Sequence, residues 1–454
     1  MIEFRSMNVL VLGSGGREHA LVWKLAQSPR VSKLWCAPGN PGLALERLAR
    51  DNSPVECPAI AADDLPSLLL FAREKNVALT VVGPDNPLAL GVVDLFQANG
   101  LRIWGPNQKA AQFESSKVFS QKFMAKYGIP TAHSGTFSDA KPARDFAASL
   151  HGRCAVKADG LALGKGVIIC HTPAQAGAAI DEIMVAQKFG RAGSQVVIQE
   201  LLEGMEISLH AICDGTTAKL FPAAQDHKRL GEKDAGPNTG GMGAYSPAPF
   251  LSQPQLAEVG GKILGPWLRG CREEAIDFRG ILYPGVMLTA GGPKVLEFNA
   301  RFGDPEAQVY LPRLENDLLD LLEASLDGTL AKTELRWRPE AAVCVVMAAA
   351  GYPGTPVKGA VISGLAEAGA LPGVKIFHAG VARRDGQFVT QGGRVLGVTA
   401  WDLGLAAARD EAYRAVAKIR FDGAQFRRDI GAKALTASAR LTELKTKLDE
   451  LRRE

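Results

Sequence analysis

The alternation of short apolar strands with amphipathic helices at the start of the chain is the feature that most limits the possible folds. Residues 8–12 form an apolar run typical of a buried strand, and a glycine turn and a helix over 18–25 follow it. The same pattern predicts strands at 34–37, 77–82 and 102–104, and helices at 65–74 and 88–99. Because parallel neighbours need a crossover helix, this order predicts a doubly wound parallel sheet. Its loops rich in glycine, proline and asparagine follow the strands, where such sheets bind ligands.

The pattern changes after about residue 110, where glycine-linked strands and helices replace the simple alternation. The sequence here predicts helical residues to 126, two glycine-linked strands over 155–170, an alanine-rich helix to 186, and strands at 196–200 and 207–212. The glycine- and proline-rich segment 231–249 contains no repeat, so we interpret it as a functional loop.

The part of the chain after Thr333 is predicted to be rich in strands. Asp385-Gly386 and Gly392-Gly393 stand between alternating runs, which indicates consecutive hairpins, and a helix over 405–419 closes the region. The chain has 454 residues, which is enough for two to four domains. We therefore expect a multidomain protein that combines an α/β part with α+β parts.

Composition excludes several classes of protein. Hydrophobic residues make up 46% and charged residues 22%, the balance of a soluble globular chain. The longest apolar run, 341–350, is too short to span a membrane, and the first residues do not resemble a signal peptide. The seven cysteines are odd in number and widely spaced, which favours a reducing compartment over a disulfide or zinc framework. A formal net charge of +4 is close to neutral and gives no sign of nucleic-acid binding. We expect a cytoplasmic protein.

The first glycine cluster, 13–18, follows a strand and opens a helix, which is a placement suited to an anion. A nicotinamide-dependent oxidoreductase would use such a loop for its dinucleotide. Glu18, however, occupies the third glycine position, and no acidic residue follows the second strand. Alone, the cluster is better interpreted as a tight turn; the polar loops 37–42 and 83–87 favour a sugar phosphate as its ligand.

The second cluster is a glycine-rich stretch between two predicted strands, 155–169. Only three residues separate Gly160 from Gly164, and Gly166 replaces the Ser or Thr of a P-loop, so the stretch is a hairpin instead. Lys157 lies on its first strand and Lys165 in its turn. Two lysines on a mobile hairpin suit a triphosphate.

The third cluster is predicted to place three functional groups on one face of a strand. Glu297, Asn299 and Arg301 alternate in sequence, so their side chains share a face. Carboxylate and amide oxygens suit magnesium. Arg301 can hold a carboxylate or a phosphoryl group with two parallel hydrogen bonds.

These clusters together resemble the ATP-grasp ligases, and within them the glycinamide ribonucleotide synthetase family. The resemblance covers residues 7 to about 435. It rests on 13–19 (Gly-Ser-Gly-Gly-Arg-Glu-His), 157–160 (Lys-Ala-Asp-Gly), 225–229 (Gln-Asp-His-Lys-Arg), 236–247 and 297–306.

The resemblance implies a fold with an N-terminal Rossmann-like domain at 1–110 and an ATP-grasp domain at 111–332, whose lid lies at about 127–198. A C-terminal α+β domain at 333–436 would follow, and a tail helix at 437–454 lies outside the resemblance. The tail carries leucines at a seven-residue spacing, which favours packing on its own domain over a dimerising coil. We therefore expect a monomer. Residues 1–6 also lie outside the resemblance.

The activity that the resemblance implies joins glycine to 5-phosphoribosylamine at the expense of ATP through a glycyl phosphate, in purine biosynthesis. The implied metal is Mg²⁺ or Mn²⁺ on Glu297 and Asn299. The implied catalytic residues are Arg301, Lys157 and Lys165. ATP would be bound by Lys117, Lys157, Gly160, Gly164, Lys165, Gly166, Glu200, Leu202 and Glu206. The two other substrates would be bound by Gly15, Gly16, Gly39, Asn40, Asp85, Asp226, Lys228, Asn238, Arg301 and Asp304.

Three positions depart from the family pattern. Gln199 stands where Glu is usual, so contact with the adenine amine would use a neutral oxygen. Leu163 replaces a small residue in the hairpin, and Asp85 replaces a commoner Glu near the sugar. Two alternative functions remain. One is another ATP-grasp carboxylate–amine ligase or carboxylase, and the other is a non-catalytic nucleotide sensor. His227 is a candidate base for the sugar amine, and a structural hydrogen-bonding role for it is at least as well supported.

Overall fold

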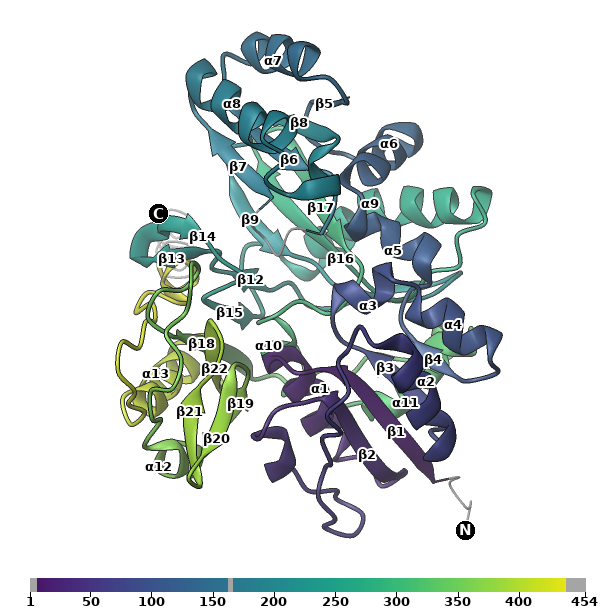
Figure 1. The fold of residues 1–454 in the computed structure, drawn as a ribbon, viewed down its shortest axis with the longest axis vertical. Helices are drawn as coiled ribbons and strands as arrows, with labels where there is room; N and C mark the ends of the chain where they lie inside the picture. Colours follow the sequence, from purple (N-terminus) through teal and green to yellow (C-terminus); the bar gives the residue numbers. More distant parts are fainter. Residues whose placement is uncertain (1–5, 162–165, 438–454) are drawn as a thin grey trace, which may run out of the picture.

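The computed structural model describes residues 6–161 and 166–437. Its N-terminal part is a parallel sheet in the order β2-β1-β3-β4, as the alternation predicts (Figure 1). The strands are β1 (Met7–Gly13), β2 (Val31–Pro38), β3 (Leu79–Val82) and β4 (Ile103–Trp104). The helices are α1 (Gly16–Leu25), α2 (Leu65–Glu74), α3 (Asp85–Ala89) and α4 (Val92–Ala98).

The single helix predicted over 88–99 is wrong, because α3 and α4 are separate. Gly91 lies between them with a φ of +84°, a left-handed conformation that glycine adopts easily and that breaks the helix. Helix α3 begins at Asp85, shortly after β3, so this predicted substrate residue lies at the carboxyl edge of the sheet.

The second part contains an antiparallel sheet that carries the predicted hairpin. Its order is β5-β8-β6-β7, and it lies at the top of Figure 1 beside α7 (Ala140–Ser149) and α8 (Pro173–Ile180). The strands are β5 (Ser134–Phe137), β6 (Cys154–Ala158), β7 (Val167–Cys170) and β8 (Val196–Glu200). The antiparallel pairing of β6 with β7 confirms the hairpin interpretation of residues 155–169. A turn of π-helix over Asp181–Val185 continues α8.

A second antiparallel sheet lies below this one in Figure 1, in the order β11-β10-β16-β17, with β9 paired to β16. Its strands are β9 (Met205–Ser208), β10 (Ala211–Asp214), β11 (Ala218–Leu220), β16 (Arg279–Thr289) and β17 (Gly292–Asn299). The helices of this region are α5 (Gln108–Ser115), α6 (Lys117–Tyr127), α9 (Gln253–Glu273), α10 (Ala307–Tyr310) and α11 (Leu318–Leu326). The strand predicted at 207–212 is interrupted at Leu209-His210, so β9 and β10 are separate strands.

The C-terminal sheet has the order β12-β15-β18-β22-β19. It consists of β12 (Gln225–Asp226), β15 (Gly243–Ser246), β18 (Ala341–Ala348), β19 (Val374–His378) and β22 (Arg394–Asp402). Helix α13 (Leu405–Val416) packs on β18 and β22, and a short α12 (Leu365–Gly369) precedes β19. The Asp385-Gly386 hairpin is confirmed: both residues have positive φ, and they join β20 (Val381–Arg384) to β21 (Gln387–Thr390).

Two predictions about the loops of this region are wrong. Gly392-Gly393 does not make a hairpin, because β22 pairs with β18 and β19 and not with β21. The segment 231–249 is not one irregular loop. It contains β14 (Ala235–Asn238), which pairs with β13 (Arg229–Gly231), and β15, which joins the C-terminal sheet. The partner of β15 lies about a hundred residues away, beyond the reach of a local pattern.

Buried polar contacts join the N-terminal sheet to the C-terminal sheet. The backbone N–H of His378 donates to Nδ1 of His19 at 2.8 Å, and Nδ2 of Asn40 donates to the His378 carbonyl at 3.1 Å. Glu46 binds Nε2 of His19 at 2.9 Å and Nζ of Lys375 at 2.5 Å. Because these groups would be left without partners if the sheets separated, the contacts hold the first and last parts of the chain together.

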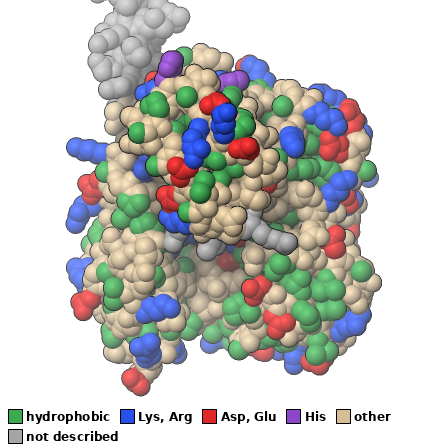
Figure 2. Space-filling view, turned by 45° about the horizontal axis from the view of Figure 1, so that its top comes forward, with side chains coloured by type: hydrophobic (Ala, Val, Ile, Leu, Met, Phe, Trp, Pro, Cys, Tyr) green, Lys and Arg blue, Asp and Glu red, His purple; other side chains and the backbone are tan. Residues whose placement is uncertain are grey.

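The surface agrees with the near-neutral composition. On the face drawn in Figure 2, acidic and basic side chains of the described residues are interspersed rather than gathered by sign. Among these residues there is also no helix with the length and apolar character needed to cross a membrane.

Candidate functional site

Glu18 fills the place where a dinucleotide phosphate would bind. Its carboxylate accepts the N–H of Gly15 at 2.6 Å and the Nε–H of Arg17 at 2.6 Å, so it caps α1. The side chain is buried, and it lies against Gly13 and Gly83, where a Cβ atom would collide with it. The anion at this helix N-terminus is thus supplied by the chain itself. This arrangement disfavours the nicotinamide-dependent oxidoreductase.

The predicted substrate residues Gly15 and Gly16 lie next to Asp304, another predicted substrate residue. A Cβ atom on Gly15 would lie 3.5 Å from Oδ2 of Asp304, and one on Gly16 would lie 2.6 Å from Nε2 of Gln308. Gln308 itself donates to Oδ1 of Asp304 at 2.6 Å. The first glycine loop and the end of the third cluster therefore form one surface, although they are almost 300 residues apart in sequence.

Arg394 holds Asp304 in this position. It binds the Asp304 carboxylate at 2.9 Å and also donates to the carbonyl oxygens of Asp304 and Gly240. Burial alone would raise the pKa of Asp304, but the positive charges of Arg394 and Arg17 outweigh it and lower the pKa. The carboxylate is therefore ionised at neutral pH.

The second substrate loop contacts the first. Nδ2 of Asn40 donates to the Ser14 carbonyl at 2.8 Å, and its Oδ1 accepts the N–H of Gly42 at 2.8 Å. Gly39 has a φ of +66° and approaches Cys57, so no Cβ atom fits there. Asp85, in the third loop, accepts the N–H of Asn86 at 3.0 Å and begins α3.

The predicted metal pair lies at the end of β17. Glu297 is surrounded by positive charge: burial alone would raise its pKa, but Lys228, Lys157 and Lys117 lower it to about 2. Asn299 donates from Nδ2 to the Tyr283 carbonyl at 3.3 Å, and its Oδ1 accepts from Nη2 of Arg301 at 3.3 Å. One ionised carboxylate and one fixed amide oxygen are a donor set that fits a hard divalent cation. Asn299 ends β17, so Arg301 lies just beyond the strand and still contacts the pair.

Three lysines converge near Glu297 from different elements. Lys157 on β6 is only 5% exposed and donates to the Leu296 carbonyl at 2.9 Å. Burial lowers its pKa to about 8, against the opposite pull of Glu297. Lys117 begins α6 and donates to the Gly160 carbonyl at 3.1 Å. Lys228 lies 3.7 Å from the Glu297 carboxylate.

The start of the glycine hairpin is tied to α6. Asp159 accepts the Ser116 hydroxyl at 3.0 Å and the Val118 N–H at 3.1 Å, which places Lys117 beside Gly160. Gly166 accepts the Ala158 N–H at 2.8 Å through its carbonyl. Predictions for Leu163, Gly164 and Lys165 lie outside the described residues.

The residues predicted to bind the nucleoside lie at the ends of β8 and β9. The Glu200 carboxylate binds the His133 N–H and Nζ of Lys294, both at 2.9 Å, so its side chain is already engaged. Leu202 is partly buried in the link to β9. Glu206 on β9 pairs with Lys228 at 2.5 Å. Lys228 therefore joins the predicted ribose carboxylate to the predicted metal carboxylate.

Gln199 is buried in the same strand, with 1% of its surface exposed, and its Nε2 has no partner among the described residues. A buried donor without an acceptor costs stability, which is unusual unless a ligand supplies the acceptor.

The remaining predicted residues lie around the segment 225–243. Burial raises the pKa of Asp226 well above its usual value, and the nearby Glu306 adds to the effect. His227 is buried and contacts the Gly243 carbonyl through Nδ1 at 3.2 Å, and burial lowers its pKa to about 4. These contacts favour a structural role for His227. Asn238 ends β14, opposite Arg229 of β13.

Two charged residues at this site were missed by the sequence analysis, Glu114 and Arg394. Glu114 pairs with Arg301 at 2.8 Å, and Arg394 pairs with Asp304 as described. The local signals were weak: Glu114 stands three residues before Lys117, and Arg394 directly follows Gly392-Gly393, a pair that indicates only a turn.

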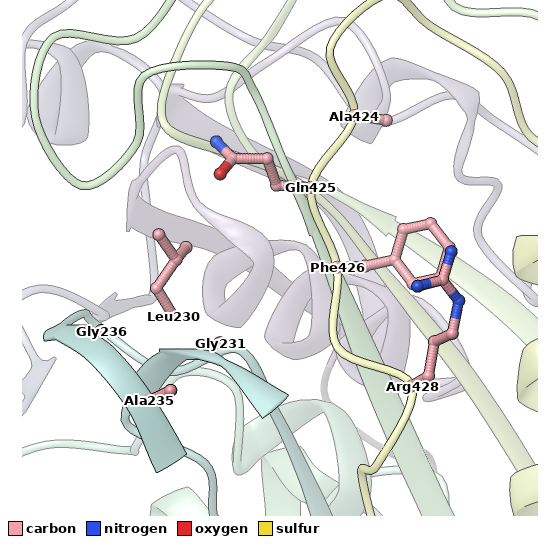
Figure 3. Close-up of a pocket in the computed structure, with 8 residues that line it drawn as sticks. All are labelled: Leu230, Gly231, Ala235, Gly236, Ala424, Gln425, Phe426 and Arg428. Carbon is pink, nitrogen blue, oxygen red and sulfur yellow. The ribbon is translucent and has the colours of Figure 1, made fainter. Parts of the chain in front are cut away.

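A cavity of about 450 Å³ lies beside this region, between the β13–β14 hairpin and residues 424–428 (Figure 3). In Figure 3 the Phe426 and Arg428 side chains lie together, and the guanidinium is 5.5 Å from the ring centre. The described residues of the predicted site are not among those that line this cavity. It therefore adds nothing to the site.

Comparison with known proteins agrees with this geometry. Family models match three consecutive parts of the chain: the phosphoribosylglycinamide synthetase N domain at 7–114, its ATP-grasp (A) domain at 115–307 and its C domain at 342–433. A phosphoribosylamine–glycine ligase of Mesorhizobium japonicum is 48% identical over 94% of this chain and 99% of its own length.

Solved structures are also similar to this chain. The crystal structure of phosphoribosylamine–glycine ligase from Thermotoga maritima has a TM-score of 0.78 and 33% identity, covering 93% of this chain and all of that one. The biotin carboxylase domain of a Hydrogenobacter thermophilus 2-oxoglutarate carboxylase has a TM-score of 0.72 at 14% identity, covering 93% of this chain and 92% of that one, and so shares the fold alone. The chain therefore belongs to the phosphoribosylglycinamide synthetase family, as its three matched domains and its nearly full-length relatives show.

Proposed function

We propose that the chain is a phosphoribosylamine–glycine ligase, which joins glycine to 5-phosphoribosylamine in purine biosynthesis and converts ATP to ADP and phosphate. The observation that carries the proposal is the convergence of Lys117, Lys157 and Lys228 on the ionised Glu297, next to the surface that Gly15, Gly16 and Asp304 share. Such a site can hold a triphosphate and a second, smaller anion side by side.

The reaction has two steps. An oxygen of the glycine carboxylate attacks the γ-phosphorus of ATP, the bond to the β-phosphate oxygen breaks, and ADP leaves. The amine of phosphoribosylamine then attacks the carbonyl carbon of glycyl phosphate, and phosphate leaves as the amine loses a proton. Phosphoryl transfer depends mainly on positioning and charge neutralisation, which the lysines supply. Lys165 is proposed to add to them from the hairpin.

Glu297 and Asn299 would hold the divalent cation, Mg²⁺ or Mn²⁺, which would supply positive charge to neutralise the phosphates. Nζ of Lys228 pairs with Glu297 at 3.7 Å and with Glu206 at 2.5 Å. The link at Glu200–Leu202 would contact adenine, and Glu206 the ribose hydroxyls.

The other two substrates would lie between the glycine loops and Asp304. The loops at Gly15–Gly16 and Gly39–Asn40 are proposed to contact the sugar phosphate, although the N–H groups of Gly15 and Gly39 are themselves engaged by Glu18 and by the Gly13 carbonyl. Asp85, Asp226, Lys228 and Asn238 are proposed as further sugar contacts, and Arg301 with Asp304 as contacts of glycine.

A hairpin lid that closes over ATP would keep water from the mixed anhydride. We place the domain boundaries at 110 and 332 and the lid at about 127–198. The protein is proposed to act as a monomer in the cytoplasm, on small molecules alone.

A turnover assay in which each component is omitted in turn tests the function. ADP release is expected to need both glycine and phosphoribosylamine, and Glu297→Ala is expected to abolish it. Glu258→Ala is the matched control, because Glu258 is an exposed carboxylate that pairs with Lys262 on the surface of α9. ADP release that depends on bicarbonate, or that proceeds without either substrate, would contradict the proposal.

A further inference from the structure

Glu114 is a buried carboxylate with both of its oxygens engaged at the end of β17. Its Oε2 accepts the Ala300 N–H at 2.8 Å, and its Oε1 pairs with Nη2 of Arg301 at 2.8 Å. Its side chain is 9% exposed. One side chain therefore fixes both the backbone that follows the proposed metal pair and the guanidinium that lies beside it.

The position of Glu114 is set by packing. It lies near the end of α5, and the preceding residue, Phe113, packs edge-on against Phe298 of β17 at 5.8 Å. Phe113 also contacts Phe123 and Trp267, so α5 is held on several sides. A side chain on such an element loses little further freedom when it binds a partner, which makes it suitable for holding another group in place.

The hydrogen bonds of Arg301 leave a donor unused. Nη2 forms an ion pair with Glu114 at 2.8 Å and donates to Oδ1 of Asn299 at 3.3 Å, and Nη1 donates to the Phe302 carbonyl at 3.3 Å. Nε is buried and has no acceptor in the part of the chain that the structure describes. Nε of Arg30 is likewise without a partner among the described residues, but Arg301 also contacts Asn299 of the proposed metal pair, so an acceptor for its Nε is assigned to a substrate at that site.

Charge supports the same arrangement. Burial lowers the pKa of Arg301, but the Glu114 and Asp85 carboxylates outweigh this effect and raise it. Burial raises the pKa of Glu114, and Arg301 opposes that rise. On balance burial dominates and the pKa of Glu114 is raised, so the support for the pair is its geometry, a separation of 2.8 Å between Oε1 and Nη2.

We propose that Glu114 is a positioning residue: it orients Arg301 so that the free Nε edge of the guanidinium receives the carboxylate of glycine. The inference rests on the proposed function, since it assigns the anion that Arg301 binds. Without the carboxylate at 114, the guanidinium can rotate away from this orientation, and the contact of Nε with the substrate carboxylate is lost.

The test is a double-mutant cycle in the full-length enzyme with Glu114→Gln and Arg301→Lys, read by initial rates at varied glycine. Glu114→Gln keeps the side chain's shape and an oxygen for the Ala300 N–H, so the fold is retained. It is expected to raise the KM for glycine about tenfold and to leave the KM for ATP within about twofold. In the Arg301→Lys background, it is expected to change the glycine KM by less than about twofold.

The matched control is Glu323→Gln. Glu323 is also mostly buried and paired with an arginine, Arg30 at 2.7 Å, but it lies on α11 away from the proposed substrate contacts. It is expected to leave both KM values unchanged. Thermal unfolding of every variant shows whether the fold is kept.

The outcomes separate the two proposals. A wild-type enzyme that releases no ADP with glycine and phosphoribosylamine overturns the proposed function. An active wild-type enzyme whose Glu114→Gln variant keeps the wild-type glycine KM overturns the positioning role alone. The positioning role is also overturned if the changes in glycine KM caused by the two substitutions multiply in the double variant, because Glu114 would then act independently of Arg301. If Glu114→Gln does not fold, the more conservative Glu114→Asp replaces it, with the same expected rise in glycine KM and the same contradicting result.

Discussion

Acidification is expected to weaken the contact between the N-terminal and C-terminal sheets through one buried histidine, His378. Its ring is packed between His19 and Phe388, and it is 6% exposed. Neither ring nitrogen has a partner among the described residues. Burial lowers the pKa of His378 to about 3, and the positive charges of His19 and Lys375 add to the effect, while Glu46 opposes it.

The sign of the pH dependence follows from this shift. The folded-state pKa is below the unfolded value of 6.5, so the unfolded chain takes up the proton first as pH falls. Protonation of His378 therefore does not lower the free energy of unfolding above about pH 7. Its contribution lowers that free energy progressively from pH 6.5 down to about pH 3. The loss amounts to about 2 kcal/mol at pH 5 and about 5 kcal/mol in full.

The perturbation that isolates this contribution is His378→Phe. Phenylalanine keeps the ring packing and removes the unpaired ring nitrogens, so the variant is expected to be no less stable than the wild type at pH 7.5. Between pH 7.5 and pH 5 its free energy of unfolding is expected to fall by about 2 kcal/mol less than that of the wild type. His19 and Glu46 titrate in both proteins, so the difference reports on His378.

Urea unfolding followed by tryptophan fluorescence provides the measurement. Trp23 lies 5.8 Å from Phe377 and 6.1 Å from Trp401, so its emission reports on this contact between the sheets. His171→Phe, at an exposed histidine outside the contact, is the control and is expected to keep the acid dependence of the wild type. An equal loss of stability on acidification in His378→Phe and in the wild type would refute the reasoning.

Three further predictions concern the proposed site. Lys157→Met removes a buried ammonium whose pKa burial lowers to about 8, so the melting temperature at pH 7 is expected to rise while turnover is lost; a lower melting temperature would count against it. Gln199→Leu removes an unpaired buried donor and is expected to raise both the melting temperature and the KM for ATP; an unchanged KM would exclude a nucleotide contact. Asp304→Asn breaks the ion pair with Arg394, and kcat/KM for glycine is expected to fall at least tenfold, measured by initial rates; wild-type kinetics would remove Asp304 from the site.

The sequence alone predicts the parts of the fold that depend on local patterns. The run at β1, the glycine turn and α1 are neighbours in sequence, so their apolar periodicity and turn residues suffice to predict them. The β6–β7 hairpin is predicted for the same reason, since its strands flank one glycine-rich turn. The proposed metal pair is also local, because Glu297 and Asn299 share one strand.

The features that the sequence does not predict depend on partners far along the chain. Gly243 of β15 pairs with Val345 of β18, so the glycine-rich segment looks irregular until the C-terminal sheet is assembled. Glu114 pairs with Arg301, and Arg394 pairs with Asp304. No periodicity in the sequence links the members of either pair. An isolated charged residue is most often solvated, so only three-dimensional contact separates these two from the rest.

The contact between Asn40 and His378 also has a consequence for the order of events during synthesis. The two residues are 338 positions apart. At about 5–20 residues per second, a ribosome needs roughly 20 to 70 s to travel between them. Throughout that interval the face of α1 that carries His19 and Trp23 is without the strand that later covers it. Nascent chains that stop short of β19 therefore expose an aromatic surface on the N-terminal part, which is synthesised first. A chaperone that binds such surfaces can bind this one throughout that interval.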